Sequence, residues 1–260
     1  MGSAARQGAL WGAAARDWAD LTEGVQAPFY EAAFDAINVD SGTLLLDVGC
    51  GAGLALQLAA GRGAVVTGLD AAEGLLEVAR ERLPEADLRQ GDIEELPYED
   101  DTFDAVTAFN SVQYATDPTG ALREIKRVAK PGAPVAIATW GNPELCEMRL
   151  VLGAIGSLLP PPPPGAGGPF ALAAPGALEA LVEGAGLTAQ KVIEVPTPYE
   201  FADIETAVRG QLSSGPARAA IEHTSRDAVS AALTEALTPV VRADGTIRLD
   251  NVFKVVITQA

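Results

Sequence analysis

The stretch Leu-Leu-Leu-Asp-Val-Gly-Cys-Gly-Ala-Gly, residues 44–53, decides the fold of this chain. Its first half is an apolar run that ends at an acid, Asp47, and a valine, and its second half alternates glycines with small residues. A continuous apolar run is typical of a parallel strand that is buried on both faces. Glycines allow a tight turn and a close approach of the backbone to a ligand. The stretch therefore predicts a buried strand followed by a ligand-binding turn.

Strand-like and helix-like segments alternate from this stretch to about Trp140. Strand-like runs recur at residues 65–70, 88–91, 103–109 and 133–139, and again at residues 187–195 and 252–258. Apolar residues recur at helical spacing between the second and third runs, and between the fourth and fifth. Strands that alternate with helices predict an α/β fold with a doubly wound, mainly parallel sheet.

The chain changes character after Trp140. Five prolines at residues 160–164, followed by the glycine-rich residues 165–168, predict an extended loop because proline cannot continue a helix. Residues 203–241 have a largely helical pattern and precede the last strand-like run. Ligands of doubly wound sheets bind at the carboxyl ends of the strands. The helical stretch is therefore predicted to cover that crevice.

The composition of the chain limits the kinds of molecule that it is expected to bind. The chain has 260 residues, of which 48% are hydrophobic, with a formal net charge of −17 and a pI of about 4.4. The acidic surface repels nucleic-acid phosphates and anionic membranes, so neither is expected as a partner. Two cysteines and one histidine make neither a disulfide framework nor a histidine-rich metal site, and no metal is expected. The sequence has no recognisable signal peptide or membrane-spanning run, which leads us to expect a cytoplasmic protein.

Asp47 discriminates between the ligands that such a turn can bind. A glycine-rich turn alone also occurs in dinucleotide-binding enzymes, but the spacing here is G-x-G-x-G rather than G-x-G-x-x-G. A carboxylate before the turn disfavours a pyrophosphate and favours an ammonium group, which S-adenosylmethionine carries and a dinucleotide lacks. Asp47 is therefore predicted to bind the amino group of the methionine moiety. The alternative is that it caps the following helix.

The tips of the next strands carry residues suited to the rest of that cofactor. Asp70, about twenty residues past the turn, can accept hydrogen bonds from both ribose hydroxyls, or can serve as a helix N-cap. Asp92 can accept from the adenine amino group while Ile93 packs on the ring, or Asp92 can bond its own backbone in a turn. Asn110, at the tip of the fourth strand, is expected near the methionine moiety.

Taken together, these motifs resemble those of the class I S-adenosylmethionine-dependent methyltransferases. The resemblance rests on residues 45–53, 70, 91–93, 96–98, 103–106 and 127–132, and covers residues 44–140 closely. It is nearest to the small-molecule subgroup that is similar to ubiquinone and menaquinone biosynthesis methyltransferases. The resemblance implies a Rossmann-like sheet of seven strands with an antiparallel last strand. It also implies S-adenosylmethionine as cofactor, S-adenosylhomocysteine as product, and a variable cap that chooses the acceptor.

The resemblance further implies a division of the chain. Residues 1–42 are expected to form an N-terminal helical segment over the cofactor, and residues 43–200 the cofactor-binding α/β core. Residues 201–243 are expected to form a helical cap over the acceptor pocket. Residues 244–260 are expected to supply the final strand of the core sheet.

The expected cofactor contacts come from the glycine turn, the strand tips and the N-terminal segment. They are Asp47, Gly49, Cys50, Gly51, Gly53, Asp70, Ala71, Asp92, Ile93, Asn110 and Trp11. An aromatic face at Trp11 would attract the sulfonium, although the same residue could only pack its own helix. Cys50 is expected to fill space in the turn rather than to act as a nucleophile.

The remaining candidates concern the acceptor and the proton. Gln113 and Tyr114 follow the fourth strand and Trp140 ends the fifth, so these three are candidates for the acceptor pocket. His223 is the only histidine and the one side chain whose ordinary pKa suits a base near neutrality. The alternative for His223 is an exposed position in the cap, and the catalytic residue stays unassigned.

The expected activity is methyl transfer to an O, N or C atom of a small molecule, and a role in secondary metabolism is one option. The sequence after the fourth strand, Asn-Ser-Val-Gln, lacks the Asn-Pro-Pro-Tyr-type motif of enzymes that methylate amino groups of adenine or glutamine. Two alternatives to this activity remain. The chain could be a non-methylating protein that binds S-adenosylmethionine, or an NAD-dependent oxidoreductase. The acceptor's identity and the oligomeric state, monomer or homodimer, are left open.

Overall fold

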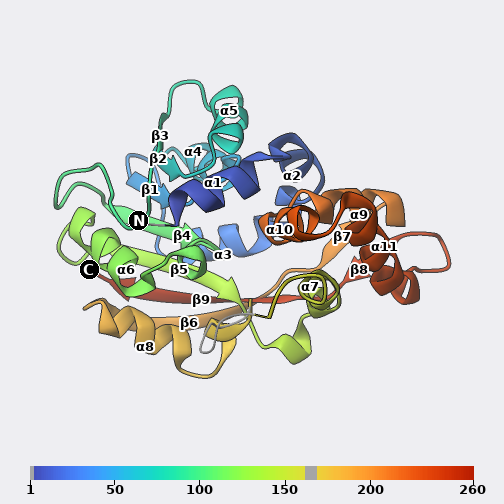
Figure 1. Cartoon of the computed structure of the whole chain (residues 1–260). Helices are drawn as coiled ribbons and strands as arrows, with labels where there is room; N and C mark the ends of the chain where they lie inside the picture. Colours follow the sequence, from blue (N-terminus) through green and yellow to red (C-terminus); the bar gives the residue numbers. More distant parts are fainter. Residues whose placement is uncertain (1–2, 162–168) are drawn as a thin grey trace.

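The computed structural model describes residues 3–161 and 169–260. Its centre is a seven-stranded sheet of order β3-β2-β1-β4-β5-β9-β6 (Figure 1). The strands are β1 (Leu44–Val48), β2 (Val65–Asp70), β3 (Asp87–Gln90), β4 (Ala105–Phe109), β5 (Pro134–Trp140), β6 (Thr188–Pro196) and β9 (Val252–Gln259). Strands β1 to β5 pair in parallel, and β9 runs antiparallel between β5 and β6. The predicted doubly wound sheet with an antiparallel last strand is confirmed.

Helices cover both faces of this sheet. They are α1 (Ala4–Gly12), α2 (Ala15–Leu21), α3 (Ala27–Ala36), α4 (Leu54–Gly61), α5 (Glu73–Arg82), α6 (Pro118–Val128), α7 (Met148–Gly156), α8 (Ala177–Gly184), α9 (Ile204–Leu212), α10 (Gly215–His223) and α11 (Arg226–Leu237). Short 3₁₀ helices are η1 (Glu23–Gln26), η2 (Val112–Tyr114), η3 (Pro143–Leu145), η4 (Ala171–Ala173) and η5 (Thr238–Val240). No described helix is both long enough and apolar enough to span a membrane.

Successive residues of the central strands face two separate cores. Leu45 packs in a cluster with side chains of α3 and α4, whereas its neighbour Leu46 packs in a cluster with side chains of α6 and α8. Both leucines are fully buried. Side chains of a strand alternate between the faces of its sheet, so a strand covered on both sides is apolar throughout. This explains why the apolar runs of the sequence coincide with strands.

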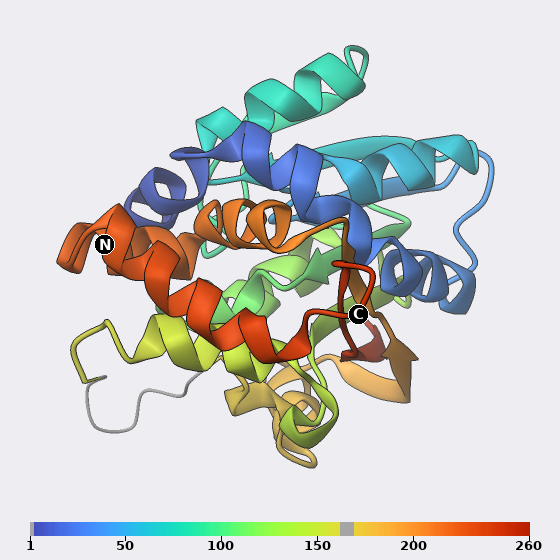
Figure 2. The same ribbon diagram turned by 90° about the vertical axis from the view of Figure 1, so that its right-hand side faces the viewer.

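The cap consists of α9, α10 and α11 together with α7. Side chains that accept a hydrogen bond from the first turn begin the cap helices: Asp203 for α9, Ser214 for α10 and Ser225 for α11. Helix α7 packs against α10 and α11, so a segment that lies between β5 and β6 joins the cap. The N-terminal helices meet the same cap, α1 against α10 and α2 against α9 (Figure 2).

One feature differs from the sequence expectations, and one expectation falls mostly outside the described residues. A second sheet of two short strands, β7 (Tyr199–Phe201) and β8 (Ile247–Leu249), was not predicted, because three residues are too few to give a periodic signal. The expected proline-rich loop lies for its greater part, residues 162–168, outside the described residues. The strand β7 matters for the site, because it carries a buried tyrosine to the sheet's ligand-binding edge.

Candidate active site

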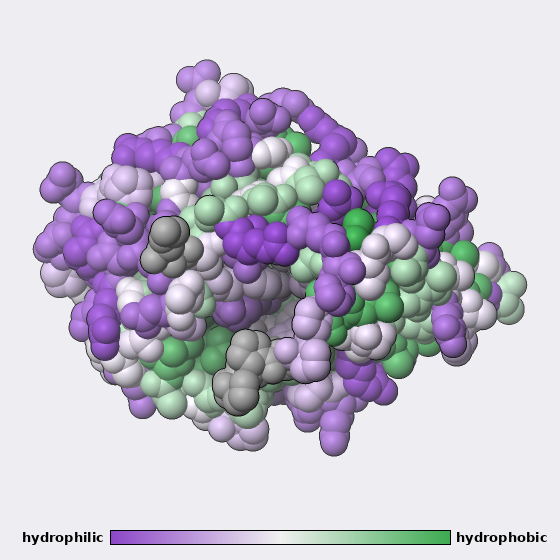
Figure 3. All heavy atoms as spheres, in the orientation of Figure 1, coloured by the Kyte–Doolittle hydropathy of each residue, from purple (hydrophilic) through white to green (hydrophobic). Residues whose placement is uncertain are grey.

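A large cavity opens at the carboxyl ends of β1, β2, β4 and β5. It encloses about 1240 Å³ of space outside protein atoms, the open solvent at its mouth included. Its lining extends from the tips of these strands to the helices of the cap. The face in Figure 3 is hollowed near its centre, between the sheet and the cap. Acidic residues line the part beside β1 and β2, and aromatic residues line the part beneath the cap.

The glycine turn leaves no room for larger residues. Gly49, Gly51 and Gly53 all have positive φ, of 82°, 56° and 83°. A Cβ on Gly49 would lie 2.3 Å from the Cβ of Ser111, whose hydroxyl donates to the carbonyl of Val48 at 2.6 Å. The turn is therefore held against the tip of β4, and only glycine fits there.

Asp47 is a buried carboxylate that lacks a cationic partner. Its side chain is 2% exposed, and its Oδ1 accepts a hydrogen bond from Thr107 Oγ1 at 2.7 Å. None of the ion pairs among the described residues includes it. Burial, reinforced by the nearby carboxylates of Asp70 and Glu23, raises the pKa of Asp47 to about 7. A carboxylate in such surroundings provides a strong binding point for a cation.

Glu23 is a second buried acid at the turn, and sequence reasoning missed it. It is 3% exposed and pairs with Arg82 of α5. Its Oε1 accepts from the backbone N–H of Leu54, at the start of α4, at 3.5 Å. Burial raises the pKa of Glu23, and the hydrogen bond from Arg82 works against that rise.

Arg82 ties the N-terminal segment to the turn. Its guanidinium donates to the carbonyl of Ala52 at 2.8 Å and to that of Ala19 at 3.2 Å, besides its contact with Glu23. One side chain therefore joins α2, η1, α5 and the glycine turn. Nothing near Arg82 in the sequence marks this role.

Asp70 uses both carboxylate oxygens on the backbone. Oδ2 accepts from the N–H of Gly51 at 2.9 Å, and Oδ1 accepts from the N–H of Ala72 at 2.8 Å. Burial raises the pKa of Asp70, and those two N–H groups oppose the rise. Asp70 thus fixes the turn and the start of α5. It also lines the cavity, beside Ala71.

The tips of β3 and β4 bring three more predicted residues to the cavity. Asp92 Oδ1 accepts from the N–H of Glu94 at 3.0 Å, so the turn role considered for it is present, and Asp92 and Ile93 both line the cavity. Asn110 has a left-handed φ of 52° and accepts from Gln113 Nε2 at 3.2 Å. These residues thus surround one end of the cavity together with Asp70.

Cys50 is part of the turn but is poorly suited to chemistry. It is 4% exposed, and burial, followed by the nearby carboxylates of Asp70 and Asp47, raises the pKa of its thiol well above the usual value. A thiol needs to ionise readily to act as a nucleophile. This placement agrees with a space-filling role.

Aromatic rings of the N-terminal segment close the cavity from above. Trp11 makes edge-to-face contacts with Trp18 and with Tyr114, at centroid distances of 4.9 and 5.7 Å. All three rings line the cavity. Trp11 also lies against Gly215 of α10, where an added Cβ would approach the indole nitrogen to 2.5 Å. Trp11 therefore packs its neighbours and faces the cavity at once, so the two readings of it are compatible.

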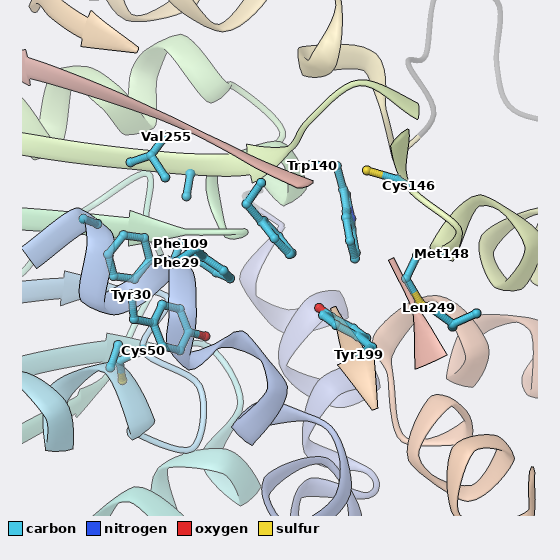
Figure 4. Close-up of a cluster of buried hydrophobic side chains, with 14 of the residues drawn as sticks. Phe29, Tyr30, Cys50, Phe109, Trp140, Cys146, Met148, Tyr199, Leu249 and Val255 are labelled. Carbon is cyan, nitrogen blue, oxygen red and sulfur yellow. The ribbon is translucent and has the colours of Figure 1, made fainter. Parts of the chain in front are cut away.

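The cap end of the cavity is lined by neutral side chains. Trp140 lies 6.0 Å from Tyr199, centroid to centroid, and Met148 of α7 lies nearby (Figure 4). The hydroxyl of Tyr30 donates to Gln26 Oε1 at 2.7 Å. Figure 4 shows the hydroxyls of Tyr30 and Tyr199 directed into the same space, from α3 and from β7.

Three predicted candidates are absent from the lining of this cavity, and Gly53 of the glycine turn is one of them. Gln113 is absent from its lining and donates instead to Asn110, which does line it. His223 is exposed at the end of α10 and is also absent from the lining. Of the acceptor candidates, Tyr114 and Trp140 are at the cavity. Sequence reasoning missed Thr22, Gln26, Tyr30, Tyr199 and Gln211, which are polar residues in apolar segments without a recognisable motif.

Comparison with known proteins identifies the domain that carries the glycine turn. Residues 46–137 match the family model described as "Methyltransferase domain". This chain contains a class I methyltransferase domain. The cofactor of such a domain is S-adenosylmethionine, and the domain is similar to those of ubiquinone and menaquinone biosynthesis methyltransferases. The predicted fold, family and cofactor are therefore confirmed.

Among curated proteins, the methyltransferase domain is similar to quinone-modifying enzymes. It is 36% identical over 117 residues to a "Demethylmenaquinone methyltransferase" of Renibacterium salmoninarum, covering 45% of this chain and 49% of that protein. It is 39% identical over 118 residues to a "Ubiquinone biosynthesis O-methyltransferase" of Alkalilimnicola ehrlichii, covering 44% of this chain and 48% of that protein. The chain thus spans about half the length of the curated relatives it matches.

Solved structures match a larger part of the chain. A putative methyltransferase of Bacillus halodurans is 16% identical with a TM-score of 0.60, and the match covers 88% of this chain and 97% of that one. The [4+2]-cyclase SpnF is 21% identical with a TM-score of 0.57, and the match covers 89% of this chain and 80% of that one. At these identities the likeness establishes the fold alone.

Proposed function

We propose that this protein transfers a methyl group from S-adenosylmethionine to an O, N or C atom of a small-molecule acceptor. The observation that carries the proposal is Asp47, a buried carboxylate without a cationic partner among the described residues, directly before a turn in which glycines alone fit. An isolated buried charge is unfavourable unless something pairs with it. The ammonium group of an amino-acid tail is the partner that such a position fits.

The other residues of the acidic end fit the rest of the cofactor. Glu23 supports the same ammonium from the N-terminal segment, and the buried hydroxyl of Thr22 has no partner among the described residues and is available to the tail's carboxylate. Asp70 retains free lone pairs for the ribose hydroxyls. Asp92 and Ile93 would hold the adenine. We infer these roles from the positions of the side chains around the cavity.

When bound, S-adenosylmethionine supplies a methyl group on a positively charged sulfur that leaves readily as a thioether. The protein's part is to align the two ligands and to exclude water, which in favourable systems is worth roughly 7–11 kcal/mol of the barrier. Trp11, Trp18 and Tyr114 cover the region between the two ends of the cavity. Their π-faces also favour a positive charge held there.

The described residues at the cap end of the cavity include no ready general base. Burial raises the pKa of Tyr114 to about 12, and burial also raises the pKa of Tyr30 and Tyr199 above the usual value. These hydroxyls therefore stay protonated near neutrality and act as hydrogen-bonding groups. The acceptor would have to supply a nucleophile that is reactive without strong base assistance.

Calorimetry tests the proposal directly. We expect wild-type protein to bind S-adenosylhomocysteine and not NAD, and we expect Asp47→Asn to weaken the former at least about tenfold because a charge-assisted contact is lost. Asp20→Asn, at an exposed position in α2, is the matched control and should leave binding unchanged. Tight binding of NAD alone, or unchanged affinity in Asp47→Asn, would refute the proposal.

Methyl transfer itself needs a separate measurement, because the fold is shared with the [4+2]-cyclase SpnF. Formation of S-adenosylhomocysteine in step with a modified acceptor would support methyl transfer. Turnover of an acceptor with the cofactor unchanged would favour the non-methylating alternative. A setting in secondary metabolism is compatible with a variable cap over a mostly apolar cavity.

A further inference from the structure

The cap-side wall of the cavity has a chemical character of its own. We use this name for Trp140, Met148, Leu152, Tyr199, Gln211 and Pro216, which come from β5, α7, β7, α9 and α10. None of the six carries a charge. Every charged side chain among the described residues that line the cavity is an acid, and these acids belong to η1 and to the tips of the strands.

Gln211 is the unexplained polar group of this wall. It is 3% exposed and lines the cavity, yet its Nε2 has no hydrogen-bond partner among the described residues. Buried amide groups are nearly always satisfied, so an orphan donor at a cavity calls for a ligand. Its helix is held close to the N-terminal segment, because a Cβ on Gly210 would lie 2.7 Å from Thr22 Oγ1. The amide therefore cannot turn to solvent without separating α9 from that segment.

The rings of the wall complement a flat ligand. Trp140 stacks on Phe253 at a centroid distance of 4.5 Å, which fixes its plane, and Tyr199 lies tilted at 49° to Trp140. The Tyr30 hydroxyl donates to Gln26 Oε1, so these two polar groups satisfy one another. Aromatic pairs favour offset or edge-to-face geometries with a further ring. Gln211 Nε2 is the buried polar atom of the wall that lacks a partner among the described residues.

Building on the proposed function, we propose that the methyl acceptor is an uncharged aromatic molecule with an oxygen substituent that accepts a hydrogen bond from Gln211 Nε2. The ring packs on Trp140, Tyr199 and Met148. An anionic acceptor would meet four carboxylates and no cation among the described lining residues. A cationic amine has no lone pair for the amide N–H and would leave it unsatisfied.

Four probes with the same naphthalene ring test the charge and the oxygen substituent separately. They are 2-naphthol, naphthalene, 2-naphthoate and 2-naphthylmethylammonium. Their dissociation constants would be measured with S-adenosylhomocysteine present and again without it. We expect 2-naphthol to bind at least about tenfold more tightly than either charged probe. Gln211→Leu should weaken 2-naphthol about tenfold and leave naphthalene unchanged, because a single hydrogen bond is removed.

Two variants control this result. Gln57→Leu, on an exposed position of α4, should change none of the four affinities. Gln211→Glu keeps the side chain's size but replaces the donor by a carboxylate, so it should weaken 2-naphthol and strengthen the ammonium probe. A thermal melt of each variant reports whether it folds, and the naphthalene affinity reports whether the wall is intact.

Equal affinity for all four probes, or no effect of Gln211→Leu on 2-naphthol, would overturn the inference. A second result would also overturn it, in which Gln211→Leu loses affinity for S-adenosylhomocysteine but not for 5′-methylthioadenosine, which lacks the amino-acid tail. Gln211 would then bind the cofactor rather than the acceptor. Failure of the wild type to bind S-adenosylhomocysteine refutes the proposed function instead. In that case the ranking of the probes without it still decides the inference.

Discussion

Asp47 illustrates how one residue can link cofactor binding to pH. Its pKa is raised to about 7 by burial, with nearby carboxylates adding to the effect. Binding an ammonium group requires the ionised carboxylate, so binding below neutrality must first remove a proton from Asp47. We expect the affinity for S-adenosylhomocysteine to increase as the pH is raised towards 7, by up to about tenfold for each pH unit. Above pH 7 the affinity should level off. Calorimetry from pH 5.5 to 8 measures this, and a flat profile would contradict it.

The same residue should lower the stability of the ligand-free protein. Its pKa is higher in the folded protein than in the unfolded chain, so the folded state binds more protons between about pH 4 and pH 7. Asp47 therefore subtracts stability as the pH rises through that window. At pH 8 we expect Asp47→Asn to increase the free energy of unfolding by on the order of 3 kcal/mol, and at pH 4 to change it little. Urea titrations at the two pH values measure the free energy of unfolding. A variant less stable than wild type at pH 8 would contradict this prediction.

Among elements, η1 and α5 depend on a buried ion pair. Arg82 and Glu23 have side chains 22% and 4% exposed, and the guanidinium also satisfies the carbonyls of Ala52 and Ala19. Removing one partner of a buried pair leaves an uncompensated charge, which typically destabilises by about 3–5 kcal/mol. We expect Arg82→Met to lower the free energy of unfolding by that order, and Arg82→Met with Glu23→Gln to recover part of the loss. Chemical denaturation provides the measurement, and a single variant within about 0.5 kcal/mol of wild type would show the pair to be dispensable.

Elements of the core sheet were predictable because each carries its own signal. All seven strands lie within one or two residues of the predicted runs. Strands β1, β2, β4, β5 and β9 are largely apolar because helices cover both faces of the sheet there. The edge strands β3 and β6 are mostly exposed and contain polar residues, so burial on both faces, which was expected for them too, is wrong. The pair β7 and β8 has no such signal, because its pairing joins segments that are far apart in the chain. The membership of α7 in the cap depends likewise on packing against α10 and α11.

The candidate site divides in the same way. Asp47, Asp70 and the glycine turn could be predicted because their chemistry and spacing lie within short stretches. Glu23 and Gln211 could not, because their significance is burial, and their burial depends on partners distant in the sequence. Gln113 follows β4 closely, yet its side chain turns to Asn110, which sequence spacing could not foresee.

At the scale of the molecule, the N-terminal helices and the cap close one cavity. Helices α1 and α2 meet α10 and α9 of the cap, and two surface ion pairs, Arg6 with Glu222 and Arg209 with Asp17, cross that boundary. Exposed pairs of this kind contribute little, about 0–1 kcal/mol each. The boundary therefore depends mainly on packing, such as that of Trp11 against Gly215. A bound ligand that touches both sides should hold them together.

Hydrogen exchange would reveal that coupling. With S-adenosylhomocysteine bound, we expect slower amide exchange in α1, α2, α9 and α10 together, because opening the boundary would then also require loss of the ligand. Helix α8 and strand β6, which lie at the opposite edge of the sheet from β3, should exchange at unchanged rates. Asp47→Asn, at the same ligand concentration, should show no slowing. Slowing confined to the glycine turn in the wild type would mean that the N-terminal segment and the cap respond independently, and would contradict the coupling.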